Sequence, residues 1–195
     1  VLYATNVESS SLPALYLAAN AVAALIPAIV IGWLCGKWLE KLPFGALGAS
    51  FSNGWLRNFV LGIIAGAVTL SFAVLVAFDF GGQRFELNLA NGWQPVLTSL
   101  TASFAVFAAA AAMEEALFRG YILQTLARSN LAWLAILLTS VFFGLVHADN
   151  PNAGVISTLN TVLAGIWFSV AYLKTRDLWF VWGLHLMWNW MQGSF

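Results

Sequence analysis

Charged side chains are scarce in this chain of 195 residues, which has eight Lys and Arg and eight Asp and Glu, 8% in all. A soluble domain carries about 25% charged residues, so the composition excludes an ordinary soluble domain. Disorder is also excluded, because it requires high charge and low hydrophobicity, whereas 61% of these residues are hydrophobic. The formal net charge is zero, so the chain lacks the excess of basic residues that is typical of nucleic-acid-binding proteins. We therefore expect an integral membrane protein whose partner is the lipid bilayer, with no nucleic-acid partner.

Cysteine and histidine are almost absent, with one Cys and two His. The single Cys35 excludes an internal disulfide and lacks the spacing of a metal-binding motif. The sequence has no His-Glu-x-x-His metalloprotease motif, no Gly-x-Ser-x-Gly esterase motif and no Gly-rich phosphate loop. Any enzymatic chemistry must therefore come from a different arrangement of a few polar residues.

The charges leave six long uncharged intervals, each able to hold a membrane helix of about 20 apolar residues. We predict an all-α, polytopic helical bundle that forms a single membrane domain over residues 1–195. Its transmembrane helices are expected at 13–35, 57–79, 95–118, 131–148, 155–173 and 178–193. A polar connection at 80–94 separates N-terminal helices within 1–80 from a core within 95–195.

Seven of the eight Lys and Arg residues lie in the segments 36–57, 119–130 and 174–177, and only Arg84 lies on the opposite side. Basic loops favour the cytoplasm. The sequence therefore predicts that these segments are cytoplasmic and that both termini lie on the other side.

Three polar clusters lie in apolar surroundings: Glu114 and Glu115 with Arg119, Phe143 with His147, and His185 with Asn189. Ionisable groups within membrane spans are candidates for functional sites. In helices, residues four apart share a face, so Glu115 faces Arg119, His185 faces Asn189, and Phe143 packs beneath His147. A structural interpretation remains open for each cluster. The charges of the first could simply end a helix, and His147 in the second could be a structural histidine at a helix end. His185 and Asn189 in the third could bond to a neighbouring helix.

The clusters can meet only if the third helix is longer than one membrane span. Residues 120–128 contain one Gly and no Pro, so they are compatible with continuation of the helix. We predict one helix over about 95–127, with Arg119 buried beside Glu115. A break at Gly120 would instead place Glu115 at the surface.

The polar residues of these clusters suit hydrolysis. A carboxylate can act as a general base, two imidazoles can hold a divalent metal, and Asn can donate to an oxyanion. Buried Glu, His and Arg also form proton relays, so a proton-coupled membrane carrier is an alternative.

The ordered set of motifs resembles that of the CPBP family, the CAAX-protease and bacteriocin-processing (Abi) membrane proteins, which include the type II CAAX prenyl endopeptidases. The matching motifs are Glu114-Glu115-x-x-x-Arg119, Phe143-x-x-x-His147 and His185-x-x-x-Asn189. Residues 118–120 and 172–179 are also similar, so the resemblance covers about 95–195. Two departures are Arg176, where a Gly-like residue is expected, and Ser169, where a second Gly after Gly165 is common.

The resemblance implies an intramembrane protease, a metalloendopeptidase-like hydrolase that acts on a membrane-associated peptide or protein. It implies that Glu114 or Glu115 activates water and that Arg119 orients the glutamates. His147 and His185 would bind a divalent metal such as zinc or polarise the substrate carbonyl, and Asn189 would complete the site. Hydrolysis with and without metal both stay open, while the residues favour Glu115 as the base because Arg119 shares its face.

A non-catalytic immunity or scaffold protein of the membrane is a further alternative within this resemblance. The compact chain with short loops leads us to expect a multi-pass protein of a bacterial cell membrane. Its substrate is not specified by the sequence: a prenylated protein, a bacteriocin leader and a small membrane peptide all remain candidates.

Overall fold

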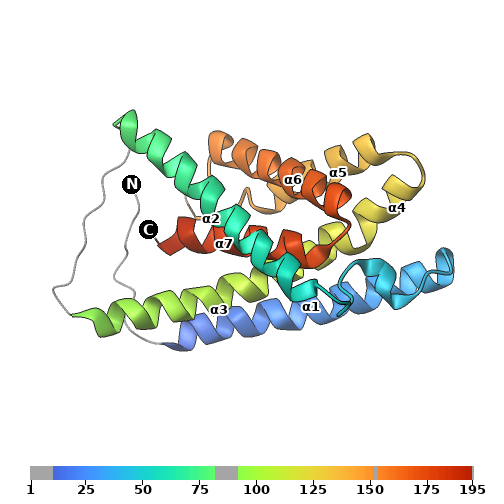
Figure 1. The fold of residues 1–195 in the computed structure, drawn as a ribbon, viewed down its shortest axis with the longest axis horizontal. Coiled ribbons are helices and arrows are strands. Elements are labelled where there is room, and N and C mark those ends of the chain that lie inside the picture. Colours follow the sequence, from blue (N-terminus) through green and yellow to red (C-terminus); the bar gives the residue numbers. More distant parts are fainter. Residues whose placement is uncertain (1–10, 82–91, 152, 195) are drawn as a thin grey trace.

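A computed structural model describes residues 11–81, 92–151 and 153–194, and every regular element among them is a helix (Figure 1). The elements are α1 (Ser11–Leu39), η1 (Phe44–Leu47), α2 (Trp55–Asp79), α3 (Trp93–Leu117), η2 (Phe118–Ile122), α4 (Leu123–Arg128), α5 (Ala132–Val146), α6 (Val155–Thr175) and α7 (Leu178–Ser194). The predicted all-α bundle is confirmed. The connection between α2 and α3, taken as the boundary between N-terminal helices and core, lies largely outside the described residues.

Four stretches of the described chain are long and apolar enough to cross a membrane: Pro13–Leu39, Trp55–Asp79, Trp93–Arg128 and Val155–Thr175. The protein is therefore an integral membrane protein. The other two predicted spans form shorter helices, with 15 residues in α5 and 17 in α7. At 1.5 Å per residue, α7 is roughly 26 Å long, somewhat less than the ~30 Å of the hydrocarbon core.

Helix α7 lies at the centre of the bundle, in contact with α2, α3 and α6, while α1 runs beside α3 and α5 packs on α6 (Figure 1). Two indole groups join α7 to α3. Trp182 Nε1 donates to the carbonyl oxygen of Ala108 over 2.9 Å, and Trp190 Nε1 donates to that of Leu100 over 3.1 Å.

Glycines allow α2 and α7 to approach each other closely. A Cβ atom at Gly62 would overlap the carbonyl group of Phe180, and one at Gly183 would overlap the carbonyl group of Phe59. Such small residues let membrane helices approach until their backbones touch. This interface fixes the position of α7, which carries His185 and Asn189.

The long third helix is confirmed, because Trp93–Arg128 forms one continuous stretch. It contains a π-helical turn over Phe118–Ile122 that the sequence did not predict. A π turn widens the helix and disturbs its regular hydrogen bonding. The buried side chain of Gln124 compensates for this, since its Nε2 donates to the carbonyl oxygens of Arg119 and Gly120 over 3.0 and 2.7 Å.

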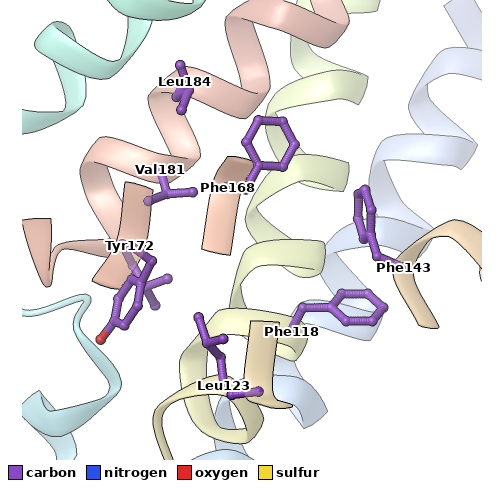
Figure 2. Packing of buried hydrophobic residues seen from close by; sticks show 9 residues of the cluster. Phe118, Leu123, Phe143, Phe168, Tyr172, Val181 and Leu184 are labelled. Carbon is purple, nitrogen blue, oxygen red and sulfur yellow. The ribbon is translucent and has the colours of Figure 1, made fainter. Parts of the chain in front are cut away.

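An aromatic and aliphatic core fills the space between the third helix, α5, α6 and α7. Figure 2 shows its members, among them Phe118, Phe143 and Phe168. The rings of Phe118 and Phe143 meet edge to face at 5.2 Å, an arrangement that aromatic pairs prefer. Ser169, one of the two departures from the family pattern, is fully buried on α6 and lies 3.5 Å from the hydroxyl of Thr139 on α5.

A partly exposed ion pair joins the ends of α1 and α4. Arg128 Nη2 lies 2.9 Å from Glu40 Oε2, and the side chains are 31% and 23% exposed. The hydrogen bond from Arg128 holds the pKa of the Glu40 carboxyl below its ordinary value. Pairs as accessible as this one contribute roughly 0–1 kcal/mol.

Arg176, the other departure, lies at the end of α6 with φ 55° and ψ 31°. This left-handed conformation costs an L-residue about 1–2 kcal/mol, whereas Gly adopts it freely but loses roughly 0.5–1 kcal/mol more on folding. We expect Arg176→Gly to raise the free energy of unfolding by up to about 1 kcal/mol. Thermal unfolding in detergent measures the change. Arg176→Ala is the matched control, since it removes the guanidinium but keeps the strain, and equal melting temperatures for both variants would contradict the prediction.

Candidate active site

The structure brings all six candidate residues together. They come from three separate stretches of chain: Glu114 and Glu115 on α3 with Arg119 on η2, His147 at the end of α5, and His185 and Asn189 on α7. The long third helix and the central α7 make this convergence possible.

Glu115 and Arg119 form a buried ion pair, with exposed fractions of 1% and 0%. Arg119 Nη1 donates to Glu115 Oε1 over 3.1 Å, and Nη2 donates to the carbonyl oxygen of Gly165 on α6 over 3.0 Å. The rings of Phe143 and Phe168 lie 4.8 and 5.5 Å from the guanidinium carbon. The guanidinium is therefore held by a carboxylate, a carbonyl and cation–π contacts.

His185 is fixed through both of its ring nitrogens. Nδ1 lies 2.7 Å from Glu115 Oε1, and Nε2 lies 2.9 Å from Asn189 Nδ2. Because an amide nitrogen only donates, Nε2 accepts, and Nδ1 carries the proton that it donates to the carboxylate. The ring also stacks on Phe168 with centroids 4.4 Å apart. This imidazole is therefore fixed in orientation.

His147 has one nitrogen engaged and one directed at the glutamates. Nδ1 lies 2.7 Å from the carbonyl oxygen of Phe143 and must donate to it, since a carbonyl only accepts. The imidazole packs on the Phe143 ring at 4.6 Å, as predicted. Nε2 faces Glu114 Oε1 at 3.8 Å.

Glu114 lies between the two histidines. Its Oε1 is 3.8 Å from His147 Nε2, and its Oε2 is 3.5 Å from His185 Nε2. The Glu114 side chain is 15% exposed. Oε2 is buried and has no hydrogen-bond partner among the described residues. Glu115 Oε2 is likewise buried without a partner, but Glu115 Oε1 is bound by both Arg119 and His185, so Glu114 is the carboxylate that the described side chains engage least.

A cavity of about 550 Å³ reaches the histidines and Asn189. Its size is typical of small-ligand sites. The remaining wall comes largely from the first half of α6 and includes Ser157, Asn160, Thr161 and Trp167. The hydroxyls of Ser157 and Thr161 bond to the backbone of α6 itself, at Gly154 and Ser157. The protons of both hydroxyls are thus engaged, whereas the amide of Asn160 can both donate to a ligand and accept from it.

The donor set fits a resident metal ion poorly. Both nitrogens of His185 are engaged by protein groups, which leaves His147 Nε2 and the Glu114 carboxylate as free donors. A protein zinc site takes at least three protein ligands. In the parts of the chain that the structure describes, no group of three or more His, Cys, Asp or Glu side chains is placed to hold a metal.

Two contributors on α6 were missed by the sequence analysis as parts of the site: the Gly165 carbonyl, which binds Arg119, and Phe168, which stacks on His185. Gly165, Phe168 and Ser169 are buried and share one face of α6, a helical spacing that marks a packed surface. That spacing alone does not show that the surface faces catalytic groups.

Comparison with family models matches residues 95–191 to the type II CAAX prenyl endopeptidase Rce1-like family. Neither the curated proteins nor the solved structures provide a match. The matched range contains all six converging residues and most of the helices that carry them, and it agrees with the resemblance seen in the motifs. Through residues 95–191, the chain belongs to the Rce1-like family of type II CAAX prenyl endopeptidases, membrane-embedded proteases.

Proposed function

We propose that this protein is an intramembrane endopeptidase that cleaves membrane-associated peptides or proteins with water activated by Glu114. The observation that carries the proposal is the position of the Glu114 carboxylate between His147 Nε2 and His185 Nε2, with an oxygen that no described group binds. Family membership supports the hydrolytic class.

In the first step, Glu114 removes a proton from water while the His147 Nε2 lone pair accepts a hydrogen bond from the same water. A gap of 3.8 Å between Glu114 Oε1 and His147 Nε2 is too long for a direct hydrogen bond and suits a bridging molecule. The water oxygen then bonds to the scissile carbonyl carbon, whose oxygen becomes an oxyanion.

Asn189 is suited to stabilise that oxyanion. Its amide nitrogen has two protons, of which one is donated to His185 Nε2, and the side chain lines the cavity. The second proton is available to a developing negative charge. In the last step, protonated Glu114 gives its proton to the amine as the C–N bond breaks, which leaves a carboxylic acid and an amine as products.

Glu115, Arg119 and His185 are positioning residues in this mechanism. In the sequence, the face shared with Arg119 favoured Glu115 as the base. In the structure, Glu115 Oε1 contacts both Arg119 and His185. We therefore assign the role of base to Glu114 and the orientation of His185 and Asn189 to Glu115.

The lining supports cleavage of an internal peptide bond. Among the described residues, no Lys or Arg lines the cavity, so a terminal carboxylate of the substrate would meet no cation there. Amides such as Asn160 and Gln192 instead match the donors and acceptors of a peptide backbone.

The test uses purified protein in lipid nanodiscs with internally quenched peptides and a prenylated CAAX-type peptide as probes. We expect cleavage that the Glu114→Gln variant lacks. Cleavage by both proteins alike would contradict the assignment of Glu114. Proton flux into liposomes without any cleavage would favour a carrier, and neither activity would favour an immunity or scaffold protein.

Treatment with a zinc chelator is expected to leave proteolysis unchanged, because this donor set offers a metal two free donors instead of three. Cleavage rates before and after 1,10-phenanthroline measure the effect, with a known zinc peptidase in the same lipid as the control. Loss of activity on chelation and its recovery with added zinc would show that proteolysis depends on a metal and would contradict the prediction.

A further inference from the structure

A short segment between α1 and α2 contacts both stretches of chain that carry most of the site. The carbonyl oxygen of Leu47, the last residue of η1, accepts a hydrogen bond from Gln124 Nε2 over 2.9 Å. The carbonyl oxygen of the next residue, Gly48, accepts from the backbone N–H of Leu178 over 2.9 Å. Gln124 follows the π turn of the third helix, and Leu178 is the first residue of α7. Two adjacent carbonyls therefore link the helix with the glutamates to the helix with His185.

The segment is itself held firmly against α6 and α7. Gly48 has a φ of 85°, in the left-handed region that Gly adopts at no steric cost. A Cβ atom there would lie 2.9 Å from the hydroxyl of Tyr172 on α6, so this position requires Gly. The indole of Trp179 on α7 donates to the carbonyl oxygen of Ser50 over 3.1 Å. The segment is thus a fixed point of attachment for the third helix.

Gln124 directs its amide donor at backbone carbonyls. Nε2 lies within 3.0 Å of three of them, those of Leu47, Arg119 and Gly120, and the residue is only 3% exposed. The last two belong to the π turn, which disturbs the regular hydrogen bonding of the helix. Without Gln124 these buried carbonyls lose a donor. A regular α turn then becomes the favoured geometry, because it pairs its carbonyls with backbone N–H groups.

A change in this turn would move the glutamates. An α-helix has 3.6 residues per turn, so loss of the widened turn rotates α3 against the chain that follows it. Glu115 Oε1 lies 2.7 Å from His185 Nδ1, a contact that such a rotation would break. Gln124 therefore controls both the shape of the π turn and its attachment to the segment that holds α7.

We infer that Gln124 is a positioning residue, which sets the glutamates against α7 through the carbonyls of the π turn and of Leu47. The inference rests on the proposed function for its effect on catalysis, whereas its effect on the contact between Glu115 and His185 can be measured without any activity. Gln124 is not among the described residues that line the 550 Å³ cavity. Its loss should therefore act on kcat and leave KM unchanged.

The experiment compares Gln124→Met with Thr125→Val in the full chain. Methionine fills similar space but has no donor, and a misplaced site costs about 10–10²-fold in kcat. Thr125→Val is the matched control, since it removes a 2.7 Å hydrogen bond to Glu40 but leaves the π turn intact. We expect the wild-type kcat for this variant. The NMR resonance of the His185 Nδ1 proton, assigned by its loss in His185→Gln, should shift only in Gln124→Met.

Wild-type kcat and an unshifted proton resonance in Gln124→Met, or equal changes in both variants, would overturn the inference. If Gln124→Met does not fold, Leu178→Pro breaks the other link, since Pro lacks the N–H but suits the first position of a helix. Its kcat should lie below that of Leu178→Val, which keeps the N–H, and equal values would again overturn the inference. The expected proton shift in a protein that cleaves no peptide would refute the proposed function alone.

Discussion

The Glu114→Gln variant is expected to lose proteolysis by about 10²–10⁴-fold, the usual contribution of a general base, without loss of thermal stability. Glutamine has the same shape but cannot take the proton of water. Stability should persist because the Glu114 oxygens lie 3.5 and 3.8 Å from the histidine nitrogens, beyond good hydrogen bonds. The measurements are kcat on a quenched peptide and the melting temperature in the same detergent.

Glu115→Gln is the matched control, one residue along the same helix and with the same chemical change. Here the buried Arg119 loses its charged partner, so the melting temperature should fall along with activity. The opposite result, with Glu115→Gln inactive at full stability and Glu114→Gln active, would transfer the role of base to Glu115.

Arg119→Met is expected to destabilise the protein by roughly 3–5 kcal/mol, as does removal of one partner from other buried ion pairs. The variant leaves the Glu115 carboxylate buried without its cation and deprives the Gly165 carbonyl of its donor. Methionine fills similar apolar space against Phe143 and Phe168, so the loss reflects charge more than volume. Unfolding in a denaturing detergent series provides the free energy.

Two controls isolate that charge. Arg128→Met removes the accessible partner of Glu40 and should change stability by only about 0–1 kcal/mol. The double change Arg119→Met with Glu115→Gln replaces the whole buried pair by neutral groups, and should be more stable than Arg119→Met alone. If Arg119→Met is no worse than Arg128→Met, the buried pair does not stabilise the fold as argued.

Much of the fold was predictable because scarce charges mark the ends of the membrane helices. The need for the three polar clusters to meet, together with the absence of Pro between Gly120 and Arg128, predicted the long third helix. The π turn within it was not predictable. It depends on Gln124 reaching backbone carbonyls, one of which, Leu47, lies 77 residues away in the chain. A contact of that range leaves no mark on local periodicity.

The candidate site likewise has contacts that the sequence predicts and contacts that it does not. Contacts between residues four apart, such as Glu115 with Arg119 and His185 with Asn189, follow from helix geometry, and the structure has both. Which of two adjacent glutamates lies between His147 and His185 depends on how α3 is rotated against α5 and α7. That rotation is set by packing between helices, so the sequence could not distinguish Glu114 from Glu115.

The glycine contact between α2 and α7 has a consequence for how the protein is made. Because α2 precedes α7 in the chain, the face that carries Gly62 and Gly66 is made well before the helix that packs on it. Helix α7 has only 17 residues and contains the polar side chains of His185 and Asn189, so it is a poor candidate for independent insertion into the membrane. Helix α2 lies outside the matched range 95–191, yet it provides the glycine face against which the last site-bearing helix packs. A chimaera that joins 93–194 to unrelated leading helices should therefore insert correctly only if one of them presents glycines at the spacing of Gly62 and Gly66.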